Sequence, residues 1–180
     1  PELSEADCPY LGLEAFQREN ANLLFGRQRL LNKLTKKLET NRLLAVVGSS
    51  GSGKSSIVLG GLIPGLEAGA LPGSEDWHYY PPLLPGSRPL ESLVRTICPR
   101  DLVSDETDDW LGKQVAQFQQ TPNHLAQLVD QLNPEIPVVV VVDQFEEVFT
   151  LCPNEDRCQA FINNLLSLIQ VTKPRHTVIL

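Results

Sequence analysis

The hydrophobic positions of this chain follow two spacings, which predict helices and buried strands in alternation. Leucines recur every three or four positions between residues 27 and 38 while lysines occupy the opposite face, and this spacing predicts a helix over 27–38. Similar spacings and the placement of prolines predict further helices at 54–66, 89–97, 110–119, 122–132 and 154–170. In the helix over 122–132, Thr121 is expected to be the N-cap and Pro122 the first helical residue.

Short apolar runs between these helices predict strands at residues 43–47, 77–84, 137–142 and 177–180. The run at 137–142 is almost entirely valine, which is typical of a central parallel strand buried on both faces. Two prolines interrupt the run at 77–84, and they favour an edge position. Strands alternating with helices predict a parallel, three-layer α/β sheet.

The length, composition and net charge of the chain narrow the classes of protein to which it could belong. The 180 residues are 42% hydrophobic and suffice for one α/β domain, which we expect over 26–180 after an irregular segment at 1–25. No apolar run approaches the roughly 20 residues of a membrane span, and no signal-peptide pattern is present. The net charge of −7 argues against direct nucleic-acid binding, and the acidic stretch at 101–109 is expected to be a solvated loop.

The cysteines and the two ends of the chain give further expectations. The four cysteines lie at positions 8, 98, 152 and 158 without a C-x-x-C pair, so we expect reduced thiols in a cytoplasmic protein and no zinc site. The chain begins with Pro1, contains no methionine and stops at an apolar run. We therefore expect a segment of a larger protein, truncated on its C-terminal side.

A complete phosphate-binding loop of the G-x-x-x-x-G-K-[ST] type stands between the first strand and the second helix. Its residues are Gly48, Ser49, Ser50, Gly51, Ser52, Gly53, Lys54 and Ser55. Glycines let the backbone turn its N–H groups toward an anion, the Lys54 ammonium suits the β- and γ-phosphates, and the Ser55 hydroxyl suits Mg²⁺. We count Ser56, the next residue, among the nucleotide-binding residues. The loop predicts a nucleoside triphosphate as ligand.

A carboxylate that completes such a site follows the valine-rich strand. Asp143 comes directly after Val142, and ligands of open parallel sheets bind at the carboxyl ends of the strands. Asp143 is therefore predicted to hold Mg²⁺ together with Ser55, as a Walker B element. Hydrolysis also needs a carboxylate that orients water. Glu147 is the favoured candidate for that role, and Glu146 stays open.

The nucleotide is expected to be ATP or ADP. A GTPase would carry D-x-x-G after this strand, where the chain has Asp143-Gln144-Phe145-Glu146, and the guanine-reading N-K-x-D motif is absent. The signature motif of ABC-type ATPases is absent too.

Several segments together resemble the novel STAND NTPase domain, a family of signal-transduction ATPases related to the AAA+ and NACHT ATPases. They are Cys8–Leu13, Phe16, Leu24–Arg27, the phosphate loop, Pro85–Ser87 and Val142–Thr150. The resemblance covers nearly the whole chain. It implies a P-loop NTPase core with strand order 5-1-4-3-2, of which the fifth strand and the helical lid are missing here, so that strand one lies at an exposed edge. It also implies that Phe25, Gly26 and Arg27 lie near the adenine, and it favours Glu147 as the catalytic glutamate. A hydrophobic staple at the start of the following helix is an equal alternative for Phe25.

The family further implies a switch that is closed with ADP and assembles after exchange for ATP. Its members usually lie between an N-terminal effector domain and C-terminal repeats, so both are expected as covalently linked partners, with self-assembly on activation. The first hypothesis is therefore a Mg²⁺-dependent nucleotide switch with slow ATP hydrolysis, in which Lys54, Glu147 and Glu146 are the catalytic candidates. The alternatives are an AAA+-like motor ATPase and an interaction scaffold without turnover.

Overall fold

The computed structural model describes residues 26–99 and 104–180, with no side chains for 104–106. These residues form two compact units, and each is described by itself. The first unit comprises 26–41 and 46–76, and the second comprises 42–45 and 77–180. The expectations for residues 1–25, including the one for Phe25, concern residues outside the described part of the chain.

The first unit is helical. Helix α1 (Gln28–Thr40) buries Leu34 and Leu38, as its leucine spacing predicts. The helix after the glycine loop consists of three consecutive parts, namely α2 (Lys54–Ile57), the π-helical η3 (Val58–Leu62) and α3 (Ile63–Glu67). Pro64 lies in the first turn of α3, and the helix continues past it to Glu67, as far as the sequence predicts. The short 3₁₀ helix η4 (Ser74–Asp76) closes this unit.

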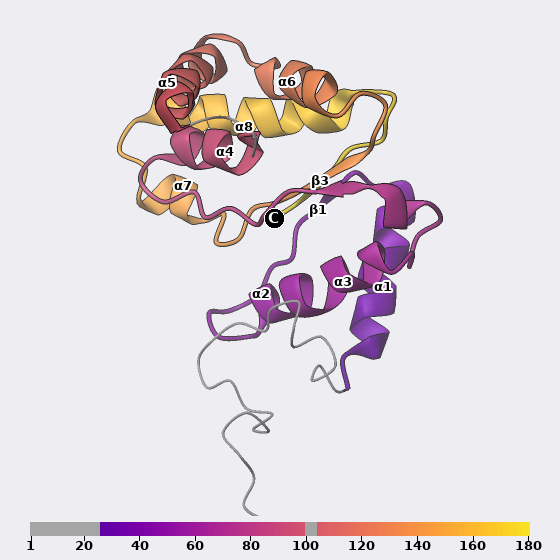
Figure 1. The fold of residues 1–180 in the computed structure, drawn as a ribbon. Helices are drawn as coiled ribbons and strands as arrows, with labels where there is room; N and C mark the ends of the chain where they lie inside the picture. The colour runs from indigo at the N-terminus through magenta and orange to yellow at the C-terminus, as the bar shows by residue number, and fades with distance from the viewer. Residues whose placement is uncertain (1–25, 100–103) are drawn as a thin grey trace, which may run out of the picture. The chain divides into compact units, whose positions relative to one another are not determined.

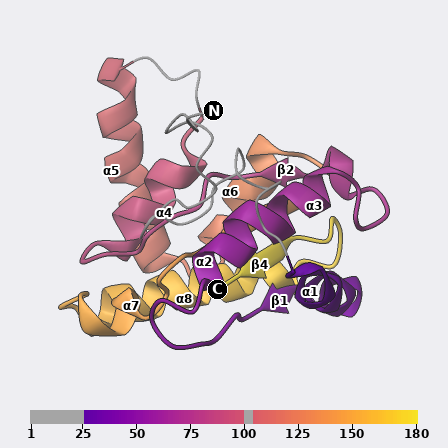
Figure 2. The ribbon, with the colours of Figure 1, turned by 90° about the horizontal axis from the view of Figure 1, so that it is seen from below.

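The second unit is built on a parallel sheet of four strands in the order β1-β4-β3-β2. The strands are β1 (Leu43–Leu44), β2 (His78–Tyr79), β3 (Val138–Val141) and β4 (Thr177–Ile179). All three pairings are parallel, with Leu43 opposite Val178, Val140 opposite Val178, and His78 opposite Val138. Figure 2 shows β1 and β4 next to each other. The order confirms the predicted 1-4-3-2 arrangement, with β1 at one edge and β2 at the other.

Helices of the second unit cover the sheet. They are α4 (Pro89–Ile97), α5 (Ser104–Gln120), α6 (His124–Leu132), α7 (Glu147–Thr150) and α8 (Glu155–Gln170). In Figure 1, α4, α5, α6 and α8 gather on one side of β1 and β3. Every residue of β3 is buried, which confirms the prediction of a central strand. Phe118, Leu125, Phe161 and Leu168 are fully buried in the core between these helices and the sheet.

Four local expectations are wrong. The strand expected over 77–84 is limited to β2, His78–Tyr79, and an isolated bridge between Leu83 and Val142 follows it. The first strand was expected over 43–47, but β1 is only Leu43–Leu44, because its pairing with β4 ends where Leu44 lies opposite Ile179. Val47 is accordingly 91% exposed. The acidic stretch was expected to be a loop, but its residues 104–109 belong to α5. Helix α6 begins at His124 rather than Pro122, because the Thr121 N–H donates to Gln117 O (2.8 Å) and so ends the preceding helix.

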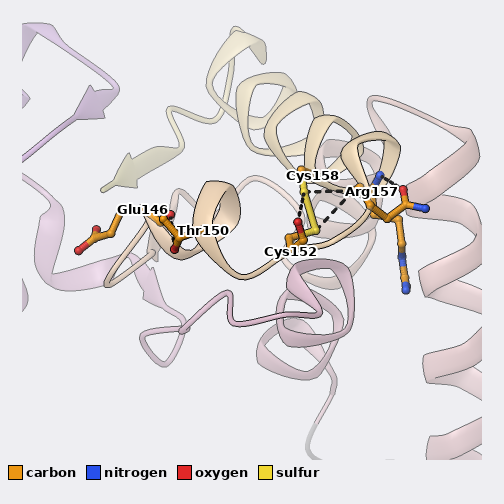
Figure 3. The surroundings of a disulfide bond; sticks show 6 residues. Glu146, Thr150, Cys152, Arg157 and Cys158 are labelled. Atoms are coloured by element: carbon orange, nitrogen blue, oxygen red, sulfur yellow. Dashed lines mark hydrogen bonds between the residues drawn. A yellow bond between two sulfur atoms is a disulfide. The ribbon is translucent and has the colours of Figure 1, made fainter.

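The cysteines also differ from expectation. Cys152 and Cys158, expected to be reduced thiols, form a disulfide between the segment after α7 and the first turn of α8 (Figure 3). Six positions separate the two cysteines, a spacing that fits no familiar motif, so the sequence alone did not reveal the pair. Cys98 is not part of the disulfide. None of the helices in 26–99 and 104–180 is long and apolar enough to span a membrane.

Candidate functional site

The phosphate-binding loop has the backbone that its glycines predict. Gly51 and Gly53 adopt positive φ angles of 73° and 84°, a region that other residues enter only with strain. A Cβ at either position would meet no atom within 4 Å, so the backbone on this side of the loop faces open space. Gly53 is also the N-cap of α2, whose first residue is Lys54. The loop therefore leads directly into a helix, the arrangement that suits an anion.

Gly48 differs from Gly51 and Gly53 because a side chain at this position would be crowded. A Cβ on Gly48 would lie 2.9 Å from Ser52 Oγ and 3.7 Å from carbons of the Lys54 side chain. The Ser52 N–H donates to Ser49 O over 3.2 Å, which closes the turn. A larger residue at position 48 would therefore require the Ser52 hydroxyl to move away.

The Lys54 side chain folds back over the loop that precedes it. Its Nζ donates to Gly48 O at 2.9 Å and to Ser49 O at 3.2 Å. Both acceptors are neutral carbonyls, and an anionic oxygen is a stronger acceptor for an ammonium. Ser55 and Ser56, in the first turn of α2, are half-buried. The ammonium thus lies at the loop, where a phosphate group would compete for it.

Part of the predicted adenine-side element is described. Gly26 has a φ of 75°, and Arg27 is the N-cap of α1, where its carbonyl accepts hydrogen bonds from Leu30 N and Leu31 N at 2.9 and 3.0 Å. The Arg27 side chain is exposed. These two residues form the entry to α1.

Asp143 lies at the carboxyl end of the central strand of the second unit. The backbone there is fixed on both sides, because Val142 N donates to Ile179 O (2.8 Å) and Asp143 N donates to Leu83 O (2.9 Å). The half-buried Asp143 side chain accepts a hydrogen bond from Gln144 N at 3.0 Å. Gln144 has a φ of 53°, which turns the chain sharply away from the strand. The carboxylate is thereby held at the sheet edge where parallel-sheet proteins bind ligands.

Glu146 and Glu147 have different surroundings. Glu147 is half-buried at the start of α7, and its Oε2 accepts a hydrogen bond from the Gly86 N–H at 3.0 Å. Glu146 is exposed, and its backbone oxygen accepts hydrogen bonds from Phe149 N and Thr150 N. Gly86 itself has a φ of 56° in the turn before α4. Nothing in the sequence indicates the contact between Gly86 and Glu147, since 61 positions separate the two residues.

The predicted nucleotide-binding residues thus fall into two groups. The loop with Lys54 and Ser55 belongs to the first unit, and Asp143, Glu146 and Glu147 belong to the second. The first group offers backbone N–H groups and an ammonium, which suit phosphate. The second offers carboxylate oxygens, which with the Ser55 hydroxyl are the hard donors that Mg²⁺ prefers. The chemistry of both groups therefore fits a magnesium nucleotide.

Comparison with known proteins identifies a family. The family model described as Novel STAND NTPase 1 matches residues 9–180. Searches of curated proteins and of solved structures found no match.

Proposed function

The chain belongs to the Novel STAND NTPase 1 family, and from that premise we propose that it is an ATP-binding, Mg²⁺-dependent switch with slow ATP hydrolysis. Membership of the family implies nucleotide binding. The observation that carries the proposal furthest is the glycine loop with the Lys54 ammonium folded over it, 2.9 Å from Gly48 O. A positive charge at a loop whose backbone faces open space is suited to a polyphosphate.

Each residue of the loop has a role in this proposal. The backbone of residues 50–53 holds phosphate oxygens, and Lys54 exchanges its carbonyl partners for the β- and γ-phosphates. Ser55 and Asp143 would hold Mg²⁺. A bound Mg²⁺ would neutralise charge on the phosphates and favour departure of ADP. Gly26 and Arg27 would contribute to the adenine side of the site.

Glu147 is the carboxylate that we propose orients the attacking water. Its half-buried side chain is fixed through Oε2 by the Gly86 N–H, so its direction is defined. Orientation is what a general base contributes beyond its basicity. The exposed Glu146 side chain lacks such a fixed partner in the described part of the chain, which favours Glu147.

The switch role extends beyond this chain. We propose that the domain acts in the cytoplasm, linked to an effector domain before it and to repeats after it, and that exchange of ADP for ATP allows self-assembly. The support is the resemblance to STAND proteins in the phosphate loop and in the segment from Val142 to Thr150. In this scheme slow hydrolysis resets the switch.

Titration calorimetry with ATP, ADP and GTP in the presence of Mg²⁺ tests the binding site. We expect adenine nucleotides to bind more tightly than GTP. The Lys54→Ala substitution should weaken ATP binding about tenfold or more, because a charge-assisted hydrogen bond is worth about 1.5–3 kcal/mol. Lys36→Ala is the matched control, since Lys36 is an exposed lysine of α1 in the same unit.

The possible results separate the proposal from its alternatives. Equal loss of binding in Lys54→Ala and Lys36→Ala would contradict a specific phosphate site. A folded protein that binds no nucleotide would favour the scaffold hypothesis instead.

A further inference from the structure

We propose that Cys152 and Cys158 form a reversible dithiol–disulfide site that exchanges with small-molecule thiols and disulfides and controls the mobility of α7. The redox site stands on its own geometry. Its effect on hydrolysis rests on the proposed function, because α7 begins at Glu147.

Both oxidation states fit the same backbone. In the disulfide, the Sγ atoms of Cys152 and Cys158 lie 3.4 and 3.1 Å from the carbonyl oxygen of Asn154 (Figure 3). When the bond is reduced, each thiol has this carbonyl as an acceptor within reach, and a carbonyl oxygen has two lone pairs. Both cysteines are half-buried rather than enclosed, so a small thiol has access. Reduction therefore leaves no buried group without a partner.

The start of α8 does not depend on the disulfide. Asn154 is its N-cap, and the Asn154 Oδ1 accepts a hydrogen bond from Arg157 N at 3.0 Å. The Cys158 N–H donates to Asn154 O at 3.1 Å. Arg157 also forms an ion pair with Glu91 of α4, with 2.7 Å between Nη2 and Oε1. These contacts remain when the sulfur–sulfur bond is broken.

Helix α7 lacks comparable support. It has only four residues, and a single helical turn is unstable without tertiary contacts. Val148 is fully buried, but Phe149 and Leu151 on the same turn are 68% and 52% exposed. Its other contacts within the second unit include the edge-on ring contact of Phe149 with Phe145, the Gly86–Glu147 hydrogen bond and the disulfide one residue after Leu151. Loss of the disulfide should therefore loosen α7 and leave α8 in place.

The exchange reaction balances with a low-molecular-weight disulfide such as oxidised glutathione. One cysteine thiolate attacks the glutathione disulfide, forms a mixed disulfide and releases one glutathione thiolate. The second cysteine thiolate attacks the mixed disulfide, forms the Cys152–Cys158 bond and releases the second glutathione. Two electrons pass to glutathione, and the two thiol protons end on the released thiolates. In the cytoplasm, where we propose that the protein acts, disulfides are usually transient or redox-sensing.

The redox site is tested by equilibrating the 180-residue chain in glutathione buffers of increasing oxidation. The protein is then trapped by alkylation, and labels are located by mass spectrometry. We expect Cys152 and Cys158 to lose their alkyl labels together as the buffer becomes more oxidising, and to regain them together when an oxidised sample is returned to a reducing buffer. The Cys152→Ser and Cys158→Ser variants should form no intramolecular bond at this site, whereas the matched control Cys98→Ser should behave as the parent chain. Failure to oxidise, or oxidation that dithiothreitol does not reverse, would overturn the proposal.

Hydrogen exchange tests the effect on α7 without any nucleotide. Reduction should speed exchange of the Phe149, Thr150 and Leu151 amides about tenfold, and amides in the middle of α8 should change less than about twofold. Unchanged exchange in α7 would overturn the proposed control of this helix. The labelling could be reversible and α7 exchange faster on reduction in a chain that does not hydrolyse ATP. That result would support the redox site and contradict the proposed hydrolysis. Hydrolysis that is equal in both redox states would overturn the link to Glu147.

Discussion

The amide N–H of Gly86 donates a hydrogen bond to Oε2 of Glu147, with 3.0 Å between nitrogen and oxygen. This bond connects the turn before α4 to the first residue of α7, so a carboxylate following the central strand is held by the loop following the edge strand. Glutamine keeps an oxygen that accepts this bond but cannot act as a base.

We therefore expect Glu147→Gln to reduce ATP hydrolysis about a hundredfold or more while nucleotide binding and the melting temperature stay close to those of the parent chain. Glu147→Ala should also lower stability by about 1 kcal/mol, because the Gly86 N–H loses its acceptor. Steady-state phosphate release and thermal denaturation measure the two effects. Glu146→Gln is the matched control, and a larger loss of hydrolysis in that variant would reverse the assignment.

Asn164 is a buried polar residue that joins three helices of the second unit. Its side chain is fully buried, its Oδ1 accepts a hydrogen bond from Leu125 N (3.0 Å), and its Nδ2 donates to Phe118 O and Ala160 O (both 2.9 Å). Asn164→Leu removes all three bonds and buries groups without partners, so we expect a loss of about 3 kcal/mol in the free energy of unfolding. Urea denaturation measures it. Asn163→Ala, on the neighbouring half-buried position, should cost under about 1 kcal/mol. Similar costs for both variants would show that the network is unimportant.

The ion pair between Arg157 and Glu91 connects α8 to α4. Its side chains are only 27% and 29% exposed, so it is less screened by water than a surface pair. A double-mutant cycle with Arg157→Gln and Glu91→Gln should give a coupling energy of about 1 kcal/mol. The exposed pair Lys113–Asp109, with both side chains 70% exposed, serves as the comparison and should give less than about 0.5 kcal/mol. Equal coupling in the two cycles would contradict this reasoning.

His176 makes stability depend on pH. Its fully buried ring accepts a hydrogen bond at Nδ1 from Val138 N (3.2 Å), and its Nε2 has no hydrogen-bond partner among the described residues. Burial lowers the pKa of His176 below its ordinary value of 6.5, and the charge of Arg42 lowers it further while that of Asp130 opposes the change. The unfolded chain therefore binds a proton at a higher pH than the folded chain does.

It follows that the stabilising contribution of neutral His176 is complete above pH 6.5 and is lost as the pH falls below that value. Free energies of unfolding at several pH values below 7 should decrease by up to about 1.4 kcal/mol per pH unit for this one proton. His176→Asn keeps an acceptor for Val138 N and should flatten the decrease. Some dependence should remain, because burial also lowers the pKa of His124. If the free energy of unfolding of this variant falls with pH as steeply as that of the parent chain, His176 is not the cause of the pH dependence.

The sequence predicted those features that local patterns determine. The valine run of β3 is buried along its whole length, and a β-branched run of this length is typical of a central parallel strand, so both the strand and its central position could be predicted. The phosphate loop was recognisable because each of its glycines and Lys54 has a separate chemical requirement. The strand order came from the family resemblance and not from residue spacing.

The features that sequence reasoning missed depend on distant partners. The length of β1 is set by β4, and the partner of Glu147 is a backbone N–H that carries no sequence signal. The helix over 104–109 was missed because a run of acidic residues suits a solvated helix turn as well as a loop. The pairing of Cys152 with Cys158 depends on the path of the backbone between α7 and α8, and the spacing of the two cysteines in the sequence does not reveal this path.

The pairing of β1 with β4 also has a consequence for the order of events on the ribosome. Leu43 lies opposite Val178, so 135 residues (178 − 43) must be added after Leu43 before its partner exists. At the usual rate of about 5–20 residues per second, roughly 7–27 s pass between the synthesis of β1 and that of its partner β4. During that interval its backbone N–H and C=O groups remain available to other chains or to chaperones. Slowing translation should therefore extend the period in which this chain is vulnerable to aggregation.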